Sequence, residues 1–226
     1  MAYRGFLFPC YPDPISGTLA EAYLRERGIS TLSDLASLRF HSRCFYRPDA
    51  DSPKLSFPAM IAGVTDLDGA ITGVQRTWLD PSGRAKAPIE TPRRAMGDLL
   101  GSAVRFGMAL DCLAAGEGIE TMLSLRSVMP TLPFAAALSA ANLAALLFPK
   151  TLRRLYVALD NDPAGKRAAA RLVDRANTVG IEAIVLSPSL KDFNDDLRAL
   201  GVEAMRALLR TQVAKEDIAR FIDSTK

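Results

Sequence analysis

The chain has 226 residues, of which 49% are hydrophobic and 23% are charged, and its formal net charge is +3. This composition excludes a disordered chain, and the length allows one large domain or a domain with a smaller companion. A single histidine, His41, excludes a histidine-based metal cluster, and three cysteines without paired spacing argue against a zinc ribbon or a disulfide framework. With no signal-peptide pattern and no apolar run long enough to span a bilayer, we predict a soluble cytoplasmic protein.

The first part of the chain contains few regular elements. Residues 1–17 are rich in proline and aromatic side chains without a period, which is typical of an arm or a linker. A helix is predicted over 19–27, because Thr18 begins a capping-box spacing and Gly28 suits a helix end. A second short helix is expected over 31–38.

Residues 39–57 are expected to be irregular, with basic side chains placed among aromatic ones. These side chains are Arg39, Phe40, His41, Arg43, Phe45, Tyr46 and Arg47. Such a mixture can hold single-stranded nucleic acid by stacking and phosphate contact. An equally weighted alternative is a solvated loop whose aromatic side chains pack inward.

A hairpin follows, because Asp68-Gly69 between the apolar runs 60–65 and 71–78 is a strong signal for a two-residue turn. Residues 86–105 are expected to be rich in loops. The stretch from residue 76 to residue 105 is the most basic part of the first half, with Arg76, Arg84, Lys86, Arg93, Arg94 and Arg105. Guanidinium groups suit phosphate, although any single one of these residues is more commonly just solvated surface.

From residue 107 the pattern changes to alternating strands and helices. Strands are predicted over 109–115, 134–138, 154–159 and 181–186, and helices over 119–128, 140–147 and 165–178. This alternation indicates an α/β domain with a mainly parallel, four-stranded sheet. One amphipathic helix, or two, is expected over 202–222.

Carboxylates follow three of these predicted strands. Glu117 follows the first, Asp160 and Asp162 follow the third, and Asp192 comes just after the fourth. The carboxyl ends of parallel strands meet at one edge, where α/β proteins bind ligands. Clustered anions repel one another unless a cation lies between them, and carboxylate oxygens favour a hard ion such as magnesium. A simpler alternative for the aspartates is a helix N-cap.

Three segments, Gly116–Thr121 (GEGIET), Leu159–Gly165 (LDNDPAG) and Lys191–Asp196 (KDFNDD), resemble the toprim domain. They are most similar to the primase-like toprim proteins of plasmids, phages and integrative elements, which have a DnaG-type catalytic core. The resemblance covers 108–200 strongly and 18–107 more loosely.

The resemblance implies a Rossmann-like toprim domain over 108–200, a smaller α+β basic subdomain over 1–107 and a helical extension over 201–226. It also implies roles for individual acids. Glu117 would be the general base or acid. Asp160, Asp162 and Asp192 would bind Mg²⁺ or Mn²⁺, with Asp195 and Asp196 competing for the part of Asp192.

The implied activity is the synthesis of RNA primers from nucleoside triphosphates on a single-stranded DNA template. Basic residues would face the template or the nucleotide, namely Arg76, Lys86, Arg93, Arg94 and Arg105. A zinc-binding module or a replicative helicase would act in trans, lie in missing segments, or not be used at all, and no membrane partner is expected. The alternatives are a toprim nuclease that hydrolyses phosphodiesters, and a non-catalytic module that binds nucleic acid or a partner.

Overall fold

The computed structural model describes residues 12–224, so the first eleven residues of the predicted arm lie outside the described part. The first half contains α1 (Leu19–Glu26), β1 (Leu38–Tyr46), β2 (Leu55–Thr65), β3 (Ile71–Trp78), β4 (Arg93–Gly97) and β5 (Val104–Phe106). The second half contains β6 (Cys112–Gly116), α2 (Ile119–Arg126), β7 (Phe134–Ala136), α3 (Ala140–Ala145), β8 (Arg154–Ala158), α4 (Pro163–Thr178), β9 (Glu182–Leu186), α5 (Phe193–Arg210), α6 (Lys215–Asp217) and a π-helical segment η1 (Ile218–Ile222). Among the helices of residues 12–224, none is long and apolar enough to cross a membrane.

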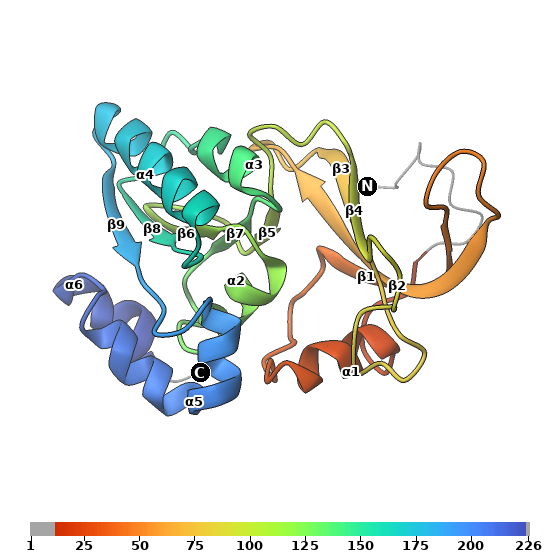
Figure 1. Ribbon diagram of the computed structural model, residues 1–226. Coiled ribbons are helices and arrows are strands. Elements are labelled where there is room, and N and C mark those ends of the chain that lie inside the picture. The colour runs from red at the N-terminus through yellow and green to blue at the C-terminus, as the bar shows by residue number, and fades with distance from the viewer. Residues whose placement is uncertain (1–11, 225–226) are drawn as a thin grey trace.

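The strands form two separate sheets (Figure 1). The first has the order β1-β2-β3-β4, and all of its pairs are antiparallel. The second has the order β5-β7-β6-β8-β9, and four of its strands are parallel. The predicted mainly parallel sheet is therefore confirmed. A fifth strand, β5, pairs with β7 in the antiparallel direction and was not predicted.

Helices cover both faces of the parallel sheet, as its almost wholly buried central strands require. On one face, Leu172 of α4 and Leu143 of α3 pack with Leu113 and Val157 of the sheet. On the other face, Leu123 of α2 and several residues of α5 join a larger cluster. That cluster also includes buried residues of α1 and β2, so the two sheets share one continuous hydrophobic core.

Two predictions for the first half are wrong. Residues 31–37 form turns rather than a helix, and the chain enters β1 at Leu38. Residues 39–57 are not irregular, because they contain β1 and the start of β2. A bulge between His41 and Cys44 interrupts the apolar alternation of β1. A strand without regular alternation cannot be recognised from the period of its hydrophobic residues.

The aromatic residues of this region divide between the two alternatives. Phe40 and Tyr46 are buried, as in the inward-packing alternative. Phe45 is 58% exposed, and the Lys54 ammonium lies 5.9 Å from its ring centroid. A role of Phe45 in stacking on nucleic acid stays a prediction.

The hairpin of β2 and β3 is confirmed, although its connection is longer than two residues. It runs over residues 66–70, and Asp66 Oδ1 accepts hydrogen bonds from the backbone of Asp68 and Ala70.

The expected helical region near the C-terminus is also present. α5 is kinked at Gly201, whose φ of +80° interrupts the helix.

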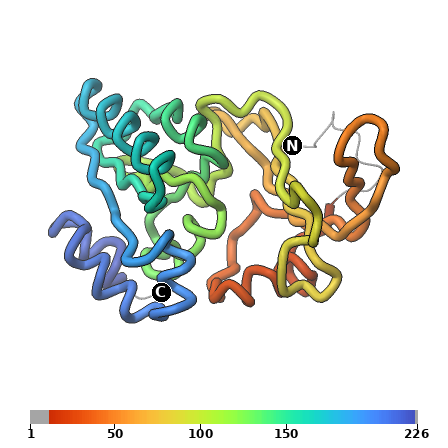
Figure 2. Tube along the Cα trace, in the orientation of Figure 1, coloured from red at the N-terminus to blue at the C-terminus, as the bar shows by residue number. Residues whose placement is uncertain are grey.

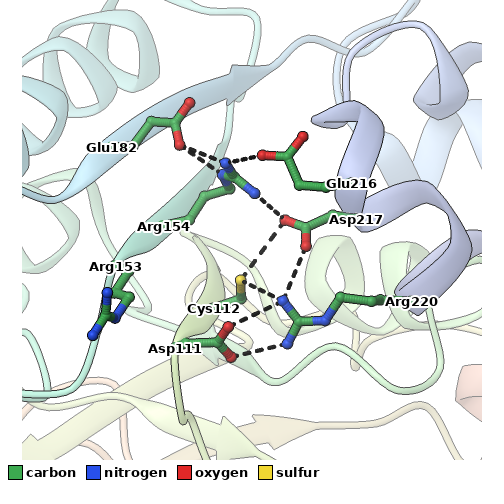
Figure 3. A pocket seen from close by; sticks show the side chains of 8 residues that line it. All are labelled: Asp111, Cys112, Arg153, Arg154, Glu182, Glu216, Asp217 and Arg220. Atoms are coloured by element: carbon green, nitrogen blue, oxygen red, sulfur yellow. Dashed lines mark hydrogen bonds and ion pairs between the residues drawn. The ribbon is translucent and has the colours of Figure 1, made fainter.

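The segment after α5 is attached to the amino ends of the parallel strands by a cluster of ion pairs (Figure 3). Arg154 of β8 pairs with Asp217, Glu216 and Glu182, and Arg220 pairs with Asp217 and Asp111. This cluster lies at the edge of the sheet opposite to the carboxyl ends of its strands.

Candidate active site

Glu117 lies directly after β6 at the carboxyl edge of the parallel sheet. Its carbonyl accepts a hydrogen bond of 2.8 Å from the backbone N–H of Leu138, which follows β7. The preceding Gly116 is packed so closely that an added Cβ would lie 2.5 Å from Met122 Cε. The backbone of Glu117 is therefore tied to the residue that follows the neighbouring strand β7.

Asp160 and Asp162 occupy the turn between β8 and α4. Asp162 is the N-cap of α4, and its Oδ1 accepts hydrogen bonds from the backbone N–H groups of Ala164 and Gly165, at 2.9 and 2.8 Å. Asp160 has no capping role, and its Oδ1 is buried without a hydrogen-bond partner. The capping alternative from the sequence thus accounts for one oxygen of Asp162 and for neither oxygen of Asp160.

Asp192 follows β9 through a loop that is tied to the Asp160–Asp162 turn. The backbone N–H of Asn161 donates to the carbonyl of Lys191 over 2.8 Å. Asp192 is the N-cap of α5 and uses Oδ1 for the backbone N–H groups of Asn194 and Asp195.

The competing acids after Asp192 differ in their surroundings. Both oxygens of Asp196 accept hydrogen bonds of 2.8 Å from the backbone of Ser189 and Leu190, so this fully buried carboxylate holds the loop in place. Asp195 lies in the first turn of α5.

The structure brings the four predicted acids together at one edge. Burial and, after it, the nearby charges of Glu117, Asp192 and Asp162 together raise the pKa of Asp160 to about 7, whereas the charge of Lys191 acts in the opposite direction. Burial and the charge of Asp162 also raise the pKa of Glu117. The acids therefore repel one another at a place where one carboxylate oxygen has no partner.

Comparisons with known proteins identify the family of the second half of the chain. Residues 112–203 match the family model of the toprim domain, and residues 12–106 match a family described as a domain of unknown function, DUF7146. Residues 112–203 form a toprim domain. A search of curated proteins finds no match.

Solved structures of primases share the fold of both halves. The zinc-binding and RNA polymerase domains of the Aquifex aeolicus primase match with a TM-score of 0.59 and 15% identity, over 92% of this chain and 59% of that one. The E. coli primase catalytic core matches with a TM-score of 0.58 and 15% identity, over 92% and 78%. A DnaG primase catalytic domain bound to single-stranded DNA matches with a TM-score of 0.59 and 16% identity, over 88% and 74%.

At these identities the likeness establishes a toprim fold of the primase type. The chain spans less than two thirds of the length of the Aquifex aeolicus fragment.

The carboxylates of the toprim domain suit a hard divalent cation. Asp160 Oδ1 is buried and unpartnered, and the caps formed by Asp162 and Asp192 each use only one oxygen. Repulsion among the acids would be relieved by a cation between them. As the side chains stand, no three acids, histidines or cysteines among residues 12–224 are arranged to enclose a metal ion.

The five predicted basic residues do not lie in one place. Lys86 Nζ lies 3.5 Å from Glu120 Oε1 of the toprim domain, and Arg93 is close enough to lower the pKa of Glu120. Arg76 and Arg94 are paired across β3 and β4, and their guanidinium groups lie 5.0 Å from the ring centroids of Trp78 and Tyr46.

Because adjacent residues of a strand point to opposite faces, Arg93 and Arg94 belong to different faces of the four-stranded sheet. Arg105 lies on β5, where burial lowers its pKa and the charge of Asp66 opposes that effect. The sequence indicated which residues are basic but not which face of the sheet each one occupies.

A buried polar network joins the toprim domain to the first half and was not predicted. Its residues are Tyr23, Arg27, Lys86, Glu120, Ser124 and Asn194. Glu120 is a buried residue of α2, and its side chain accepts a hydrogen bond from the Tyr23 hydroxyl. Nothing in the sequence indicated this network, because its hydrogen bonds join residues 70 to 167 positions apart.

Proposed function

We propose that this chain is the catalytic core of a primase, which joins ribonucleotides on single-stranded DNA in a metal-dependent nucleotidyl transfer. The observation that carries the proposal is the convergence of Glu117, Asp162 and Asp192 on Asp160, whose Oδ1 is buried without a partner. A cluster of like charges is costly for folding, so it is best explained by a ligand of opposite charge.

In this proposal Asp160, Asp162 and Asp192 would hold Mg²⁺ or Mn²⁺. The ion, when bound, supplies a Lewis acid that favours the ionised form of the attacking hydroxyl and offsets the charge of the phosphates. Glu117 would exchange a proton with the 3′-hydroxyl of the growing chain. Its raised pKa brings a carboxyl group closer to the range in which general acid–base catalysis is efficient.

The basic residues would bind the polyanionic substrates. Lys86 and Arg93 lie beside the toprim domain, so we assign them to phosphates of the nucleotide or of the template near the site. Arg76, Arg94 and Arg105 would contact the template backbone farther away. Since phosphate contacts release counterions, DNA binding is expected to weaken steeply with salt.

A single incubation distinguishes a primase, a nuclease and a non-catalytic module by their products. The protein is mixed with single-stranded DNA, labelled nucleoside triphosphates and Mg²⁺ or Mn²⁺, beside an Asp160→Asn variant. Asp174→Asn is the matched control, because it neutralises an exposed acid of α4 that has no assigned role. Metal-dependent extension that is lost only in Asp160→Asn supports the primase. Shortened DNA would instead indicate a nuclease, and binding without either product would indicate a non-catalytic module.

A further inference from the structure

The C-terminal end of α1 reaches from the first half of the chain into the toprim domain (Figure 2). Tyr23 and Arg27 are four positions apart and stack on each other, with the guanidinium carbon 4.9 Å from the ring centroid. Each of them then makes a hydrogen bond to a different toprim helix. Helix α1 is thus bonded to both α2 and α5.

The bond to α2 is made by a buried and ionised carboxylate. The Tyr23 hydroxyl donates to Glu120 Oε1 over 2.6 Å. Burial alone would raise the pKa of Glu120, but Lys86 and the Tyr23 hydrogen bond hold it below its usual range. Hydrogen bonds to a charged group are about twice as strong as neutral ones, so this is a firm attachment. Glu120 lies in the first turn of α2, three residues after Glu117.

The bond to α5 is made by a buried amide. Arg27 Nη1 donates to Asn194 Oδ1 over 3.1 Å, and Asn194 Nδ2 donates to the Arg27 carbonyl over 3.0 Å. The same amide donates to Ser124 Oγ of α2, and the backbone N–H of Asn194 donates to Asp192 Oδ1. At the end of α1, Gly28 has a φ of +77°, and an added Cβ would lie 3.4 Å from Leu197 of α5.

We propose that α1 is a brace that fixes Glu117 and Asp192 relative to each other, with Tyr23 and Arg27 as its positioning residues. These two acids follow β6 and β9, which are not adjacent, because β8 lies between them. Their spacing therefore depends on how α2 and α5 are held, and α1 holds both. The brace rests on the proposed function for the roles of Glu117 and Asp192. It implies that the spacing of Glu117 and Asp192 depends on the first half of the chain.

The brace is tested in the full chain with two variants, Tyr23→Phe and Arg27→Met, each of which keeps the packing volume. Tyr46→Phe is the matched control, because Tyr46 is also buried beneath an arginine but its hydroxyl has no partner. Mn²⁺ affinity is measured by electron paramagnetic resonance without nucleotide. Hydrogen exchange is followed in segments 117–124 and 191–197, and thermal unfolding is recorded for each protein.

Both brace variants should bind Mn²⁺ about tenfold more weakly, which is the usual effect of removing a residue that orients metal ligands. Exchange should accelerate in both segments, and Tyr46→Phe should behave as wild type. The direction in which Arg27→Met changes the Mn²⁺ affinity is decisive. Loss of a nearby positive charge would by itself strengthen Mn²⁺ binding, whereas loss of the brace weakens it.

A lower unfolding temperature with unchanged Mn²⁺ affinity and unchanged exchange would overturn the brace, since the residues would then serve stability only. If wild type binds no Mn²⁺ at all, the proposed function fails, and the exchange measurement still decides whether α1 fixes the two segments.

Discussion

Asp160 is the residue at which folding and the proposed chemistry conflict most. Three nearby acids, Glu117, Asp162 and Asp192, disfavour its charge, and one of its oxygens is buried without a hydrogen bond. Natural proteins tolerate such a cost mainly at functional sites. The two capping aspartates share this location but are partly compensated, because each binds two backbone N–H groups.

Neutralising Asp160 should therefore stabilise the metal-free protein. The pKa of Asp160 is raised to about 7, so at pH 8 the folded chain holds a carboxylate that its surroundings disfavour. We expect Asp160→Asn to raise the unfolding temperature by about 2–8 °C, which corresponds to about 1–2 kcal/mol for a chain of this size. The measurement is thermal unfolding at pH 8 with a chelator. Asp174→Asn, at an exposed position of α4, should have no comparable effect, and a lower unfolding temperature for Asp160→Asn would contradict the prediction.

The location of the four acids at one edge could be predicted, because each one comes within a few residues after a predicted strand of a parallel sheet. The sequence was not sufficient to separate Asp192 from Asp195 and Asp196. Which of three close acids faces the site depends on the path of the loop, and Asp196 is turned toward that loop by two hydrogen bonds to its backbone.

At the scale of elements, the junction of β8 and α4 determines where Asp160 lies. Gly165 in the first turn of α4 is packed against it, and an added Cβ would lie 2.5 Å from the Asp160 carbonyl oxygen and 2.9 Å from its Cβ. The first turn of α4 can therefore approach Asp160 only if this position has no side chain.

Gly165→Ala should displace Asp160 or the start of α4. Overpacking of this kind costs about 1–3 kcal/mol, so the free energy of unfolding should fall by that amount in urea titrations. Mn²⁺ binding should weaken as well, since the displaced atoms belong to the acid-bearing turn. Gly63→Ala is a suitable control, because its nearest neighbour, the Ser37 carbonyl oxygen, would be 3.8 Å from the new Cβ. Equal effects of the two substitutions would refute the special role of Gly165.

The elements that escaped prediction are the strands at sheet edges. β4 has no fully buried residue, and β5 has only three residues. β1 is an edge strand whose alternation is broken by a bulge. These strands are stabilised by pairing with distant partners rather than by their own hydrophobic pattern, so a local reading of the sequence does not detect them.

At the scale of the whole molecule, contacts between distant segments hold the two edges of the parallel sheet. The carboxyl edge is joined to the first half of the chain through α1, as argued above. The amino edge is joined to the C-terminal segment by Asp217, whose side chain has no exposed surface (Figure 3). Neither attachment could be predicted from the sequence, because charged residues are usually solvated and nothing in the sequence marks the ones that become buried.

Asp217 accepts hydrogen bonds of 2.7 Å from Arg154 and from the Tyr156 hydroxyl, and one of 3.1 Å from Arg220. Burial alone would raise its pKa, but these donors hold the pKa of Asp217 below its usual range. Removing one partner from a buried ion pair costs about 3–5 kcal/mol, so Asp217→Asn should lower the free energy of unfolding by about that amount at pH 7.

The pH dependence of this loss follows from the depressed pKa. The stabilisation from Asp217 is fully present above its unfolded pKa of about 3.9, and it is lost as the pH falls through the lower folded value. Urea unfolding of wild type and Asp217→Asn should therefore differ most at neutral pH and converge below about pH 4. Glu216→Gln is the matched control, because Glu216 pairs with the same Arg154 but is 65% exposed, and it should cost less than about 1 kcal/mol. If the two variants lose equal stability at pH 7, Asp217 is not what attaches the C-terminal segment to the sheet.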